Sequence, residues 1–147
     1  MKKYIYLIFL LCFLSACKPH ESTISTLAEQ EITTQNKDDN NALIQAFQDK
    51  KSNIFVEGAG IVKKLLPDDN KGSRHQKFLL SISTVQTLLF AHNIDLTDPV
   101  PLAVGDTIQF RGEYVYNPKG GVVHWTHHDP QGKIEGGWIK YKGKTYQ

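Results

Sequence analysis

Residues 107–128 read TIQFRGEYVYNPKGGVVHWTHH, two runs of β-branched and aromatic residues on either side of a short polar turn. The turn residues at 117–120 are Asn, Pro, Lys and Gly, which suit a tight connection because Pro presets φ and Asn and Gly accept unusual turn conformations. The stretch therefore predicts an antiparallel pair of strands at 107–116 and 121–128.

The apolar residues of this pair indicate its register. We expect Gly112 opposite Trp125, where the missing side chain leaves room for the indole, and Tyr114 opposite Val123. The reverse face then carries the polar residues Arg111, Glu113, His124, Thr126 and His128.

Four more segments have the same strand character, and Gly, Pro, Asn and Asp separate them. They are 54–65, 76–82, 87–94 and 137–147, the last folded back near Lys142 and Gly143. Six short strands without long helical patterns predict a mainly β fold, a small closed or partly closed OB-like β-barrel. A β-sandwich is the alternative.

The second and third of these strands admit two registers. One places Phe78 opposite His92 and brings the bulky apolar residues together, whereas the other places Phe78 opposite Ala91 and gives a thinner core. We prefer the first, with His92 as a hydrogen-bonded core residue.

Two histidine–carboxylate pairs follow from the preferred registers. Glu113 lies opposite His124, and His75 lies opposite Asp95 if pairing persists to the strand ends. A carboxylate this close orients an imidazole and favours its charged form.

The chain before the strands divides into three parts. Lys2 and Lys3 precede an apolar run and then small residues, the pattern of a secretory signal peptide over residues 1–16. Residues 17–40 are polar and without period, typical of a flexible tether. The domain, predicted over 41–147, begins with a short helix that Asn41 caps and that docks through its apolar face, formed by Leu43, Ile44 and Phe47.

The stretch Leu14-Ser15-Ala16-Cys17 resembles the bacterial lipobox, in which the peptide is cut before a cysteine whose sulfur carries a diacylglycerol. The resemblance implies lipidation of Cys17 and attachment to a membrane through acyl chains. Lys18, in place of the aspartate that favours inner-membrane retention, implies the outer membrane, with the domain facing the periplasm.

Composition excludes several classes of function. The chain has 17 Lys plus Arg against 15 Asp plus Glu, and loss of the signal with its two lysines balances them, which argues against a nucleic-acid partner. There is no G-x-S-x-G and no Walker-type phosphate loop. Lipidation removes Cys17 as a nucleophile. We expect no cofactor.

The run from His124 to Asp129, HWTHHD, has the composition of a metal site. On a strand, however, residues 124 and 127 point to opposite faces, and residues 124 and 128 lie roughly 13 Å apart. One zinc ion with ligands about 2 Å away cannot bridge that distance. The sequence therefore predicts no metal site, and imidazoles that hydrogen-bond to carboxylates and backbone.

From about Ile54 to Gln147 the chain resembles an uncharacterised bacterial family, domain of unknown function 3465. The matching stretches are Leu66-Pro67-Asp68-Asp69, Gly72, His75-Gln76, His92-Asn93-Ile94-Asp95-Leu96, Gly105-Asp106, Phe110-Arg111-Gly112-Glu113-Tyr114, Gly120-Gly121-Val122, His124-Trp125-Thr126-His127, Asp129-Pro130 and Gly137-Trp138. Two positions depart from the family pattern, Ile134 in place of histidine and Tyr116 in place of tryptophan. The resemblance implies the domain limits and an OB-like barrel, and it implies no activity.

We therefore expect a lipid-anchored envelope domain that binds a ligand or a protein partner. The candidate residues are His75, Gln76, Asn93, Asp95, Arg111, Glu113, His124, Trp125, His127 and Trp138. The alternative is a hydrolase whose histidine–carboxylate pairs act as acid and base, with help from a metal or from Asp68 or Asp69. In a third interpretation these polar motifs only satisfy turns and barrel ends.

Overall fold

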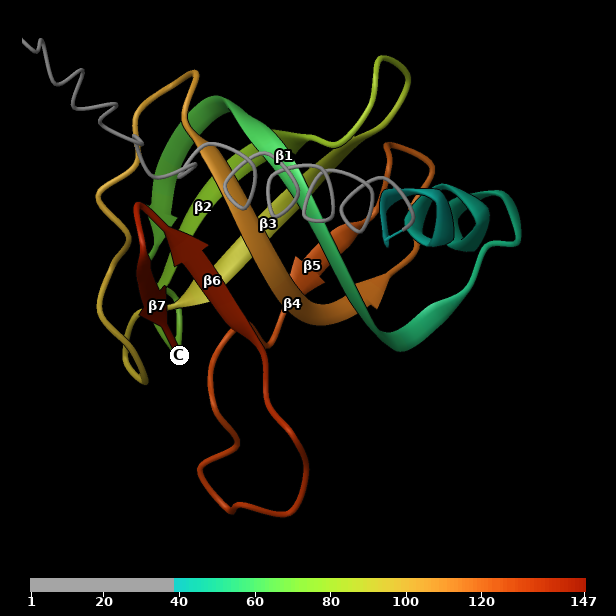
Figure 1. The fold of residues 1–147 in the computed structure, drawn as a ribbon. Helices are drawn as coiled ribbons and strands as arrows, with labels where there is room; N and C mark the ends of the chain where they lie inside the picture. Colours follow the sequence, from blue (N-terminus) through green and yellow to red (C-terminus); the bar gives the residue numbers. More distant parts are fainter. Residues whose placement is uncertain (1–38) are drawn as a thin grey trace, which may run out of the picture.

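The computed structural model describes residues 39–147. It contains seven strands: β1 (Ser52–Asp69), β2 (His75–Ser81), β3 (Thr87–Asn93), β4 (Thr107–Val115), β5 (Val122–His124), β6 (Trp138–Tyr141) and β7 (Lys144–Tyr146). They form one sheet in the order β1-β2-β3-β5-β4-β6-β7. An additional pairing of β1 with β4 joins five of the strands into a partly closed ring (Figure 1).

The predicted mainly β class with a partly closed ring is confirmed, with seven strands in place of the expected six. The predicted last strand is indeed folded back, because β6 and β7 form an antiparallel hairpin beyond β4. Lys142 and Gly143 make its turn with positive φ values of 47° and 77°.

The core lies inside the ring, where the inward residues of successive strands meet. The rings of Phe78 and Phe90 stack with centroids 4.9 Å apart, and Phe110 meets Phe90 edge-on at 4.8 Å. All three side chains are fully buried. The alternation of buried and partly buried residues along β2, β3 and β4 is the period that the sequence indicated.

β1 is longer than the expected strand at 54–65, and it runs on through Pro67, Asp68 and Asp69. Irregular pairing with β2 between Val62 and Lys64 and again between Leu66 and Asp69 makes this possible. Such bulges leave a residue unpaired, and Pro67, which has no N–H to donate, lies in the second irregularity.

The register of β4 with β5 is confirmed, with Tyr114 opposite Val123 and Glu113 opposite His124. The expected end of the second strand is wrong, because β5 stops at His124 and Trp125 has a φ of +52°. Since a non-glycine residue in that region leaves the extended conformation, the chain turns away from β4 at Trp125.

Gly112 consequently does not make room for the indole of Trp125. A Cβ at Gly112 would lie 2.7 Å from the carbonyl oxygen of His124 and 2.8 Å from the methyl group of Thr126. Thr126, predicted on the outer face, is instead completely buried. The glycine therefore allows close approach of the chain that leaves β5.

Both candidate registers for β2 and β3 are wrong, although the preferred one assigned the faces correctly. Phe78 lies opposite Phe90, two residues from the predicted His92. The turn explains the shift, because the Ile82 N–H donates to the Gln86 carbonyl and closes a loop of residues 83–85. The Ser83 hydroxyl accepts hydrogen bonds from the N–H groups of residues 85 and 86 and so stabilises this tight loop.

A helix over residues 39–48 packs on β1, as predicted (Figure 1). Leu43 of the predicted face lies in the core and Ile44 packs partly buried against it, but the second core residue is Ala46, which was not predicted. Asn41 lies inside this helix and does not cap it. Asn40 instead ties the helix to the ring, because its amide group exchanges two hydrogen bonds with the backbone of Ala59 and donates one to the Ile82 carbonyl.

The predicted signal peptide, Cys17 and all of the tether before residue 39 lie outside the described residues. Within 39–147 no helix has the length and apolar character needed to cross a membrane.

Candidate functional site: a histidine-lined cleft

A cleft of about 420 Å³ opens where the start of β2, the end of β3 and the connection from β5 to β6 meet. Figure 1 shows this connection, residues 125–137, extending from one end of the sheet. The residues that line the cleft are His75, Asn93, Leu96, His124, Trp125, His127, Asp129, Pro130 and Gln131. Five of these are candidates named from the sequence: His75, Asn93, His124, Trp125 and His127.

The turn at Trp125 is what brings His124 and His127 to the same cleft. Strand geometry predicted opposite faces for these two histidines, and that expectation is wrong because the strand ends at His124. Trp125 stacks on His127 with ring centroids 5.5 Å apart and planes at 17°. The stacked indole and imidazole therefore form one aromatic wall.

Thr126, between these two residues, fastens the wall to the core. Its Oγ1 lies 2.7 Å from Nδ1 of His92, and Nε2 of His92 lies 3.3 Å from the carbonyl oxygen of Asp98. Since a carbonyl only accepts, Nε2 of the neutral ring carries the proton and the Thr126 hydroxyl donates to Nδ1. Burial lowers the pKa of His92 to about 4, so this ring is neutral near pH 7.

Asp129 organises the far part of the connection. Its two carboxylate oxygens accept hydrogen bonds from the N–H groups of Gln131, Lys133 and Ile134 at 3.0, 2.7 and 3.2 Å. These bonds hold the pKa of the Asp129 carboxyl below its ordinary value. The only carboxylate that lines the cleft among the described residues therefore already accepts hydrogen bonds from the backbone of its own loop.

Arg111 secures the other end of the connection and does not line the cleft. Its Nε donates to the carbonyl of Gly136 at 3.1 Å, and its guanidinium lies 3.0 Å from the Glu57 carboxylate and 3.4 Å from that of Glu135. The guanidinium also lies over the ring of Phe55, 5.1 Å from its centroid. Arg111 is thus a structural clamp for the 125–137 connection.

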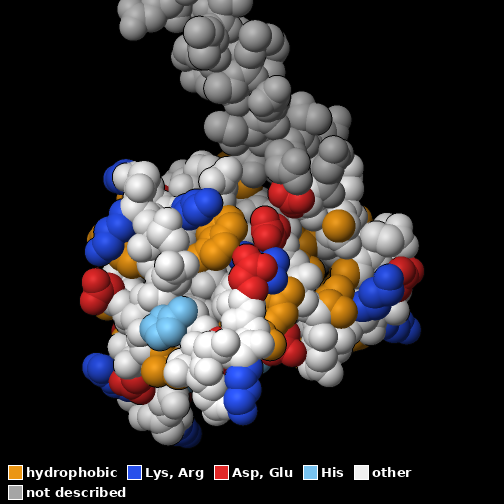
Figure 2. Space-filling model, turned by 60° about the horizontal axis from the view of Figure 1, so that its bottom comes forward, with side chains coloured by type: hydrophobic (Ala, Val, Ile, Leu, Met, Phe, Trp, Pro, Cys, Tyr) orange, Lys and Arg blue, Asp and Glu red, His pale blue; other side chains and the backbone are white. Residues whose placement is uncertain are grey.

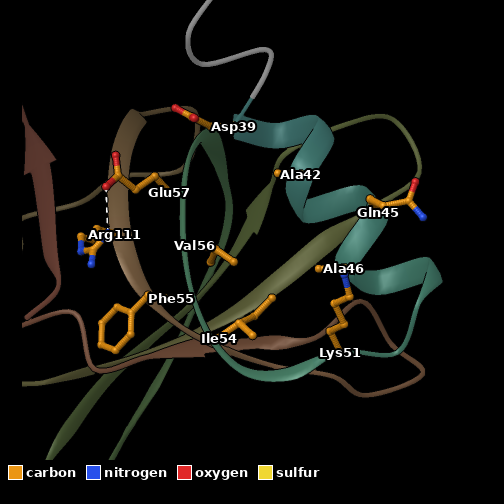
Figure 3. A pocket seen from close by; sticks show the side chains of 10 residues that line it. All are labelled: Asp39, Ala42, Gln45, Ala46, Lys51, Ile54, Phe55, Val56, Glu57 and Arg111. Carbon is orange, nitrogen blue, oxygen red and sulfur yellow. Dashed lines mark hydrogen bonds and ion pairs between the residues drawn. The ribbon is translucent and has the colours of Figure 1, made fainter.

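Arg111 borders a second hollow, of about 480 Å³, between the helix and the sheet. Figure 3 shows Ala42, Gln45 and Ala46 of the helix on one side of it and the Arg111–Glu57 ion pair on the other. Each of these two charges has its partner within the fold. This hollow therefore offers less unused bonding capacity than the histidine-lined cleft.

One of the two predicted histidine–carboxylate pairs is present. Nε2 of His124 lies 3.5 Å from the Glu113 carboxylate. The pair of His75 with Asp95 is wrong, because the true register sets His75 opposite Asn93. Asp95 instead accepts two hydrogen bonds of 2.7 Å from the backbone N–H and the Nε of Arg74, which lower the pKa of its carboxyl.

Two further candidates, Gln76 and Trp138, lie away from the cleft. The Gln76 side chain donates to the carbonyl of Val100 and accepts from its N–H, which fixes the segment after β3 to β2. Trp138 pairs with Arg111 across β4 and β6, and the ammonium group of Lys140 lies 4.3 Å from its ring centroid.

Several lining groups retain hydrogen-bonding capacity. Nδ1 of His127 lies 2.7 Å from the His128 carbonyl and must donate to it, so Nε2 of the neutral ring is left as an acceptor. Burial lowers the pKa of His127, which favours that neutral form. Asn93 uses its carbonyl oxygen to accept the Asp95 N–H at 2.9 Å, which leaves its NH₂ group. Among residues 39–147, the His75 ring and the Gln131 side-chain amide make no hydrogen bond to the protein, although the His75 ring interacts electrostatically with Asp95.

Four lining residues were not among the candidates named from the sequence: Leu96, Asp129, Pro130 and Gln131. Leu96, Asp129 and Pro130 fall within the stretches that carried the family resemblance, but nothing in the pattern singled out Gln131. Within the described part of the chain, no three His, Cys, Asp or Glu side chains are grouped so as to hold a metal ion.

Comparison with curated proteins finds no match for the chain. The sequence model of the family described as "Protein of unknown function (DUF3465)" matches residues 25–147, so that the match begins within the segment predicted as a tether. Because this match covers most of the sequence, the chain belongs to the DUF3465 family.

Proposed function

We propose that this protein is a ligand-binding domain of the bacterial cell envelope, held on the outer membrane by a lipidated Cys17 and facing the periplasm. One observation carries the binding role: three imidazoles and an indole, from the start of β2 and from residues 124–127, converge on one cleft with Asn93 and Leu96 from the end of β3. Concave sites with apolar walls and a few convergent polar groups are typical of ligand binding.

We infer binding in preference to hydrolysis. An acid–base mechanism needs groups that share one substrate atom within hydrogen-bond reach. The His124–Glu113 ion pair joins a carboxylate to an imidazole of the cleft, whereas the Asp95 carboxylate is hydrogen-bonded to Arg74 and Asp69 lies 4.0 Å from Lys77. The carboxylate of Asp129 is occupied by backbone N–H groups.

The test of the binding role uses the full chain, purified in detergent with ¹³C-labelled histidine. Its imidazole C–H resonances are followed by NMR during addition of a fragment panel of neutral saccharides, nucleosides, dipeptides and aromatic acids. We expect at least one fragment to shift the resonances of His75, His124 or His127.

Two tryptophan substitutions localise that effect. His75→Trp fills the cleft and should abolish the shift at the two other imidazoles, whereas His128→Trp, at an exposed histidine outside the cleft lining, should preserve it. A panel without any effect, or a shift that persists in His75→Trp, would refute the binding role.

The proposed anchor rests on the lipobox-like stretch that ends at Cys17. Metabolic labelling with radioactive palmitate should mark the wild-type protein and the Cys12→Ser variant, but not Cys17→Ser. Density-gradient fractionation should place the labelled protein in the outer membrane, and Lys18→Asp should move it to the inner membrane. Palmitate on Cys17→Ser would overturn the anchor.

A further inference from the structure

We propose that the ligand of the cleft is a neutral saccharide. This inference rests on the binding role proposed above and adds the chemical class of the ligand. It follows from three properties of the residues that line the cleft: their charge, their apolar surface and their unused hydrogen-bonding groups.

The charge of the lining disfavours an ionic ligand. Among the described residues, none of those lining the cleft is Lys or Arg, so phosphate or carboxylate groups would find no permanently charged cationic partner. The only lining carboxylate, Asp129, already accepts three backbone N–H groups, which leaves little to recognise a cation. In Figure 2, acidic, basic and hydrophobic side chains are interspersed on the face in view, without a broad area of one sign.

The apolar part of the cleft has the form that a sugar ring requires. The stacked pair of Trp125 and His127 supplies a flat aromatic wall, and Leu96 and Pro130 add aliphatic surface. The C–H groups on one face of a pyranose are apolar and pack well on such surfaces, because aromatic rings bury a large area with little loss of conformational entropy.

The polar part of the cleft supplies neutral hydrogen-bond donors and acceptors. A hydroxyl group can pair with both kinds, because it both donates and accepts hydrogen bonds. Nε2 of His127 is an acceptor for a hydroxyl, while the NH₂ group of Asn93 is a donor to a hydroxyl or to an acetamido oxygen. The amide of Gln131 offers one group of each kind. A ligand without hydroxyl or amide groups would leave these atoms unpaired once water is displaced.

The backbone at Trp125 supports this role for the aromatic wall. Its φ of +52° is unfavourable for a residue with a bulky side chain, and such strain is retained where surrounding contacts enforce it and is concentrated at binding sites. Here the buried Thr126–His92 hydrogen bond enforces it from the next residue.

The experiment measures tryptophan fluorescence of the full chain in a detergent without a sugar headgroup, since a glycoside detergent would compete. Trp138→Phe leaves Trp125 as the only tryptophan, because the sequence contains two. Titration with N,N′,N″-triacetylchitotriose and maltotriose, both neutral, should give a saturable change in emission. Glucose 6-phosphate and glucosamine, one anionic and one cationic, should bind at least tenfold more weakly.

Two isosteric changes test the assigned hydrogen bonds. Asn93→Asp keeps the oxygen that accepts the Asp95 N–H but removes the NH₂ donor, and Gln131→Glu removes a second donor. Each should weaken saccharide binding about fivefold or more. Gln48→Glu makes the same chemical change at an exposed helix residue away from the cleft and should leave binding unchanged.

The outcomes separate this inference from the binding role. If neither oligosaccharide changes Trp125 emission but another class of fragment shifts the cleft histidines, the saccharide assignment is wrong and the binding role stands. If no fragment acts at the cleft, both are wrong. Saccharide binding that Asn93→Asp and Gln131→Glu leave unaltered would place the sugar elsewhere and also overturn the inference.

Discussion

The hydrogen bond between His92 and Thr126 joins the inside of the ring to the first residues of the connection that forms the cleft. Its heavy atoms, Nδ1 and Oγ1, are 2.7 Å apart, and both side chains are fully buried. Because Thr126 lies between Trp125 and His127, this bond positions the aromatic wall. Stability of the core and the geometry of the site therefore depend on the same pair.

We predict that the protein loses stability as the pH falls from about 6.5 toward 4. The folded pKa of His92 is about 4 against 6.5 for an unperturbed histidine, so over this interval the unfolded chain binds more protons. The contribution of His92 is fully present above pH 6.5 and declines through the interval by on the order of 3 kcal/mol. His127, whose pKa is also lowered, acts in the same direction. Urea denaturation at several pH values measures the effect.

His92→Gln is the control for this pH dependence. Glutamine can replace the hydrogen bonds of the ring but does not titrate, so the variant should show a slope shallower by about 1.4 kcal/mol per pH unit between pH 6 and 4. An unchanged slope in His92→Gln would assign the pH dependence to other groups. The pKa values of Asp95, Asp106 and Asp129 are also lowered in the folded protein, but these groups affect the free energy of unfolding only below about pH 4, where carboxylates become protonated.

Thr126→Val tests the hydrogen bond with nearly constant volume. The variant leaves Nδ1 of His92 buried without a donor, which we expect to lower the free energy of unfolding by about 1 to 3 kcal/mol. Thr126→Ser keeps the hydroxyl and loses only the methyl group near Gly112, so it should lose about 1 kcal/mol. Equal stability of the valine variant and the wild type would contradict the assigned bond.

Arg111→Lys should loosen the 125–137 connection while the ring stays folded. Lysine keeps the charge but cannot bond simultaneously to Glu57, Glu135 and the Gly136 carbonyl as the guanidinium does. Hydrogen exchange at the Gly137 N–H, which donates to the His127 carbonyl at 2.8 Å, should accelerate at least tenfold. Lys119→Arg, at an exposed turn, should not change this rate. Protection at Gly137 that survives in Arg111→Lys would show that the clamp is dispensable.

Ser83→Ala tests the turn that sets the register of β2 and β3. The Ser83 hydroxyl accepts the N–H groups of Val85 and Gln86 at 3.3 and 3.1 Å. Its loss should destabilise the fold by about 1 kcal/mol, as measured by thermal or urea unfolding. The neighbouring Thr84→Ala removes an exposed hydroxyl and should be neutral. A larger effect at residue 84 than at residue 83 would refute this account of the turn.

The register of β2 with β3 shows where sequence reasoning reached its limit. A shift of two residues keeps every side chain on its own face, so the apolar pattern determines the face but does not distinguish Phe90 from His92 as the partner of Phe78. The turn chemistry at Ser83 decides between them, and it depends on one side-chain rotamer. The predicted pair of His75 with Asp95 was wrong for this reason alone.

The candidate site shows a different limit. Strand periodicity separates His124 from His127, and only the positive φ of Trp125 brings the two into one cleft. That conformation depends on the buried contact of Thr126 with His92, which lies 34 residues away in sequence. No local pattern in the sequence indicates a bond of this kind.

The sequence by itself determined the mainly β class, the approximate positions of the strands although not the ends of β1 and β5, the fold-back at Lys142 and the Glu113–His124 pair, because these follow from side-chain alternation and from local turn residues. Only the tertiary structure decided which histidines share a cleft and which residues form ion pairs with Arg111 and Asp95. The physical reason is that these contacts join segments far apart in the chain, and their geometry depends on bulges, on turns and on one strained residue that no local sequence pattern specifies.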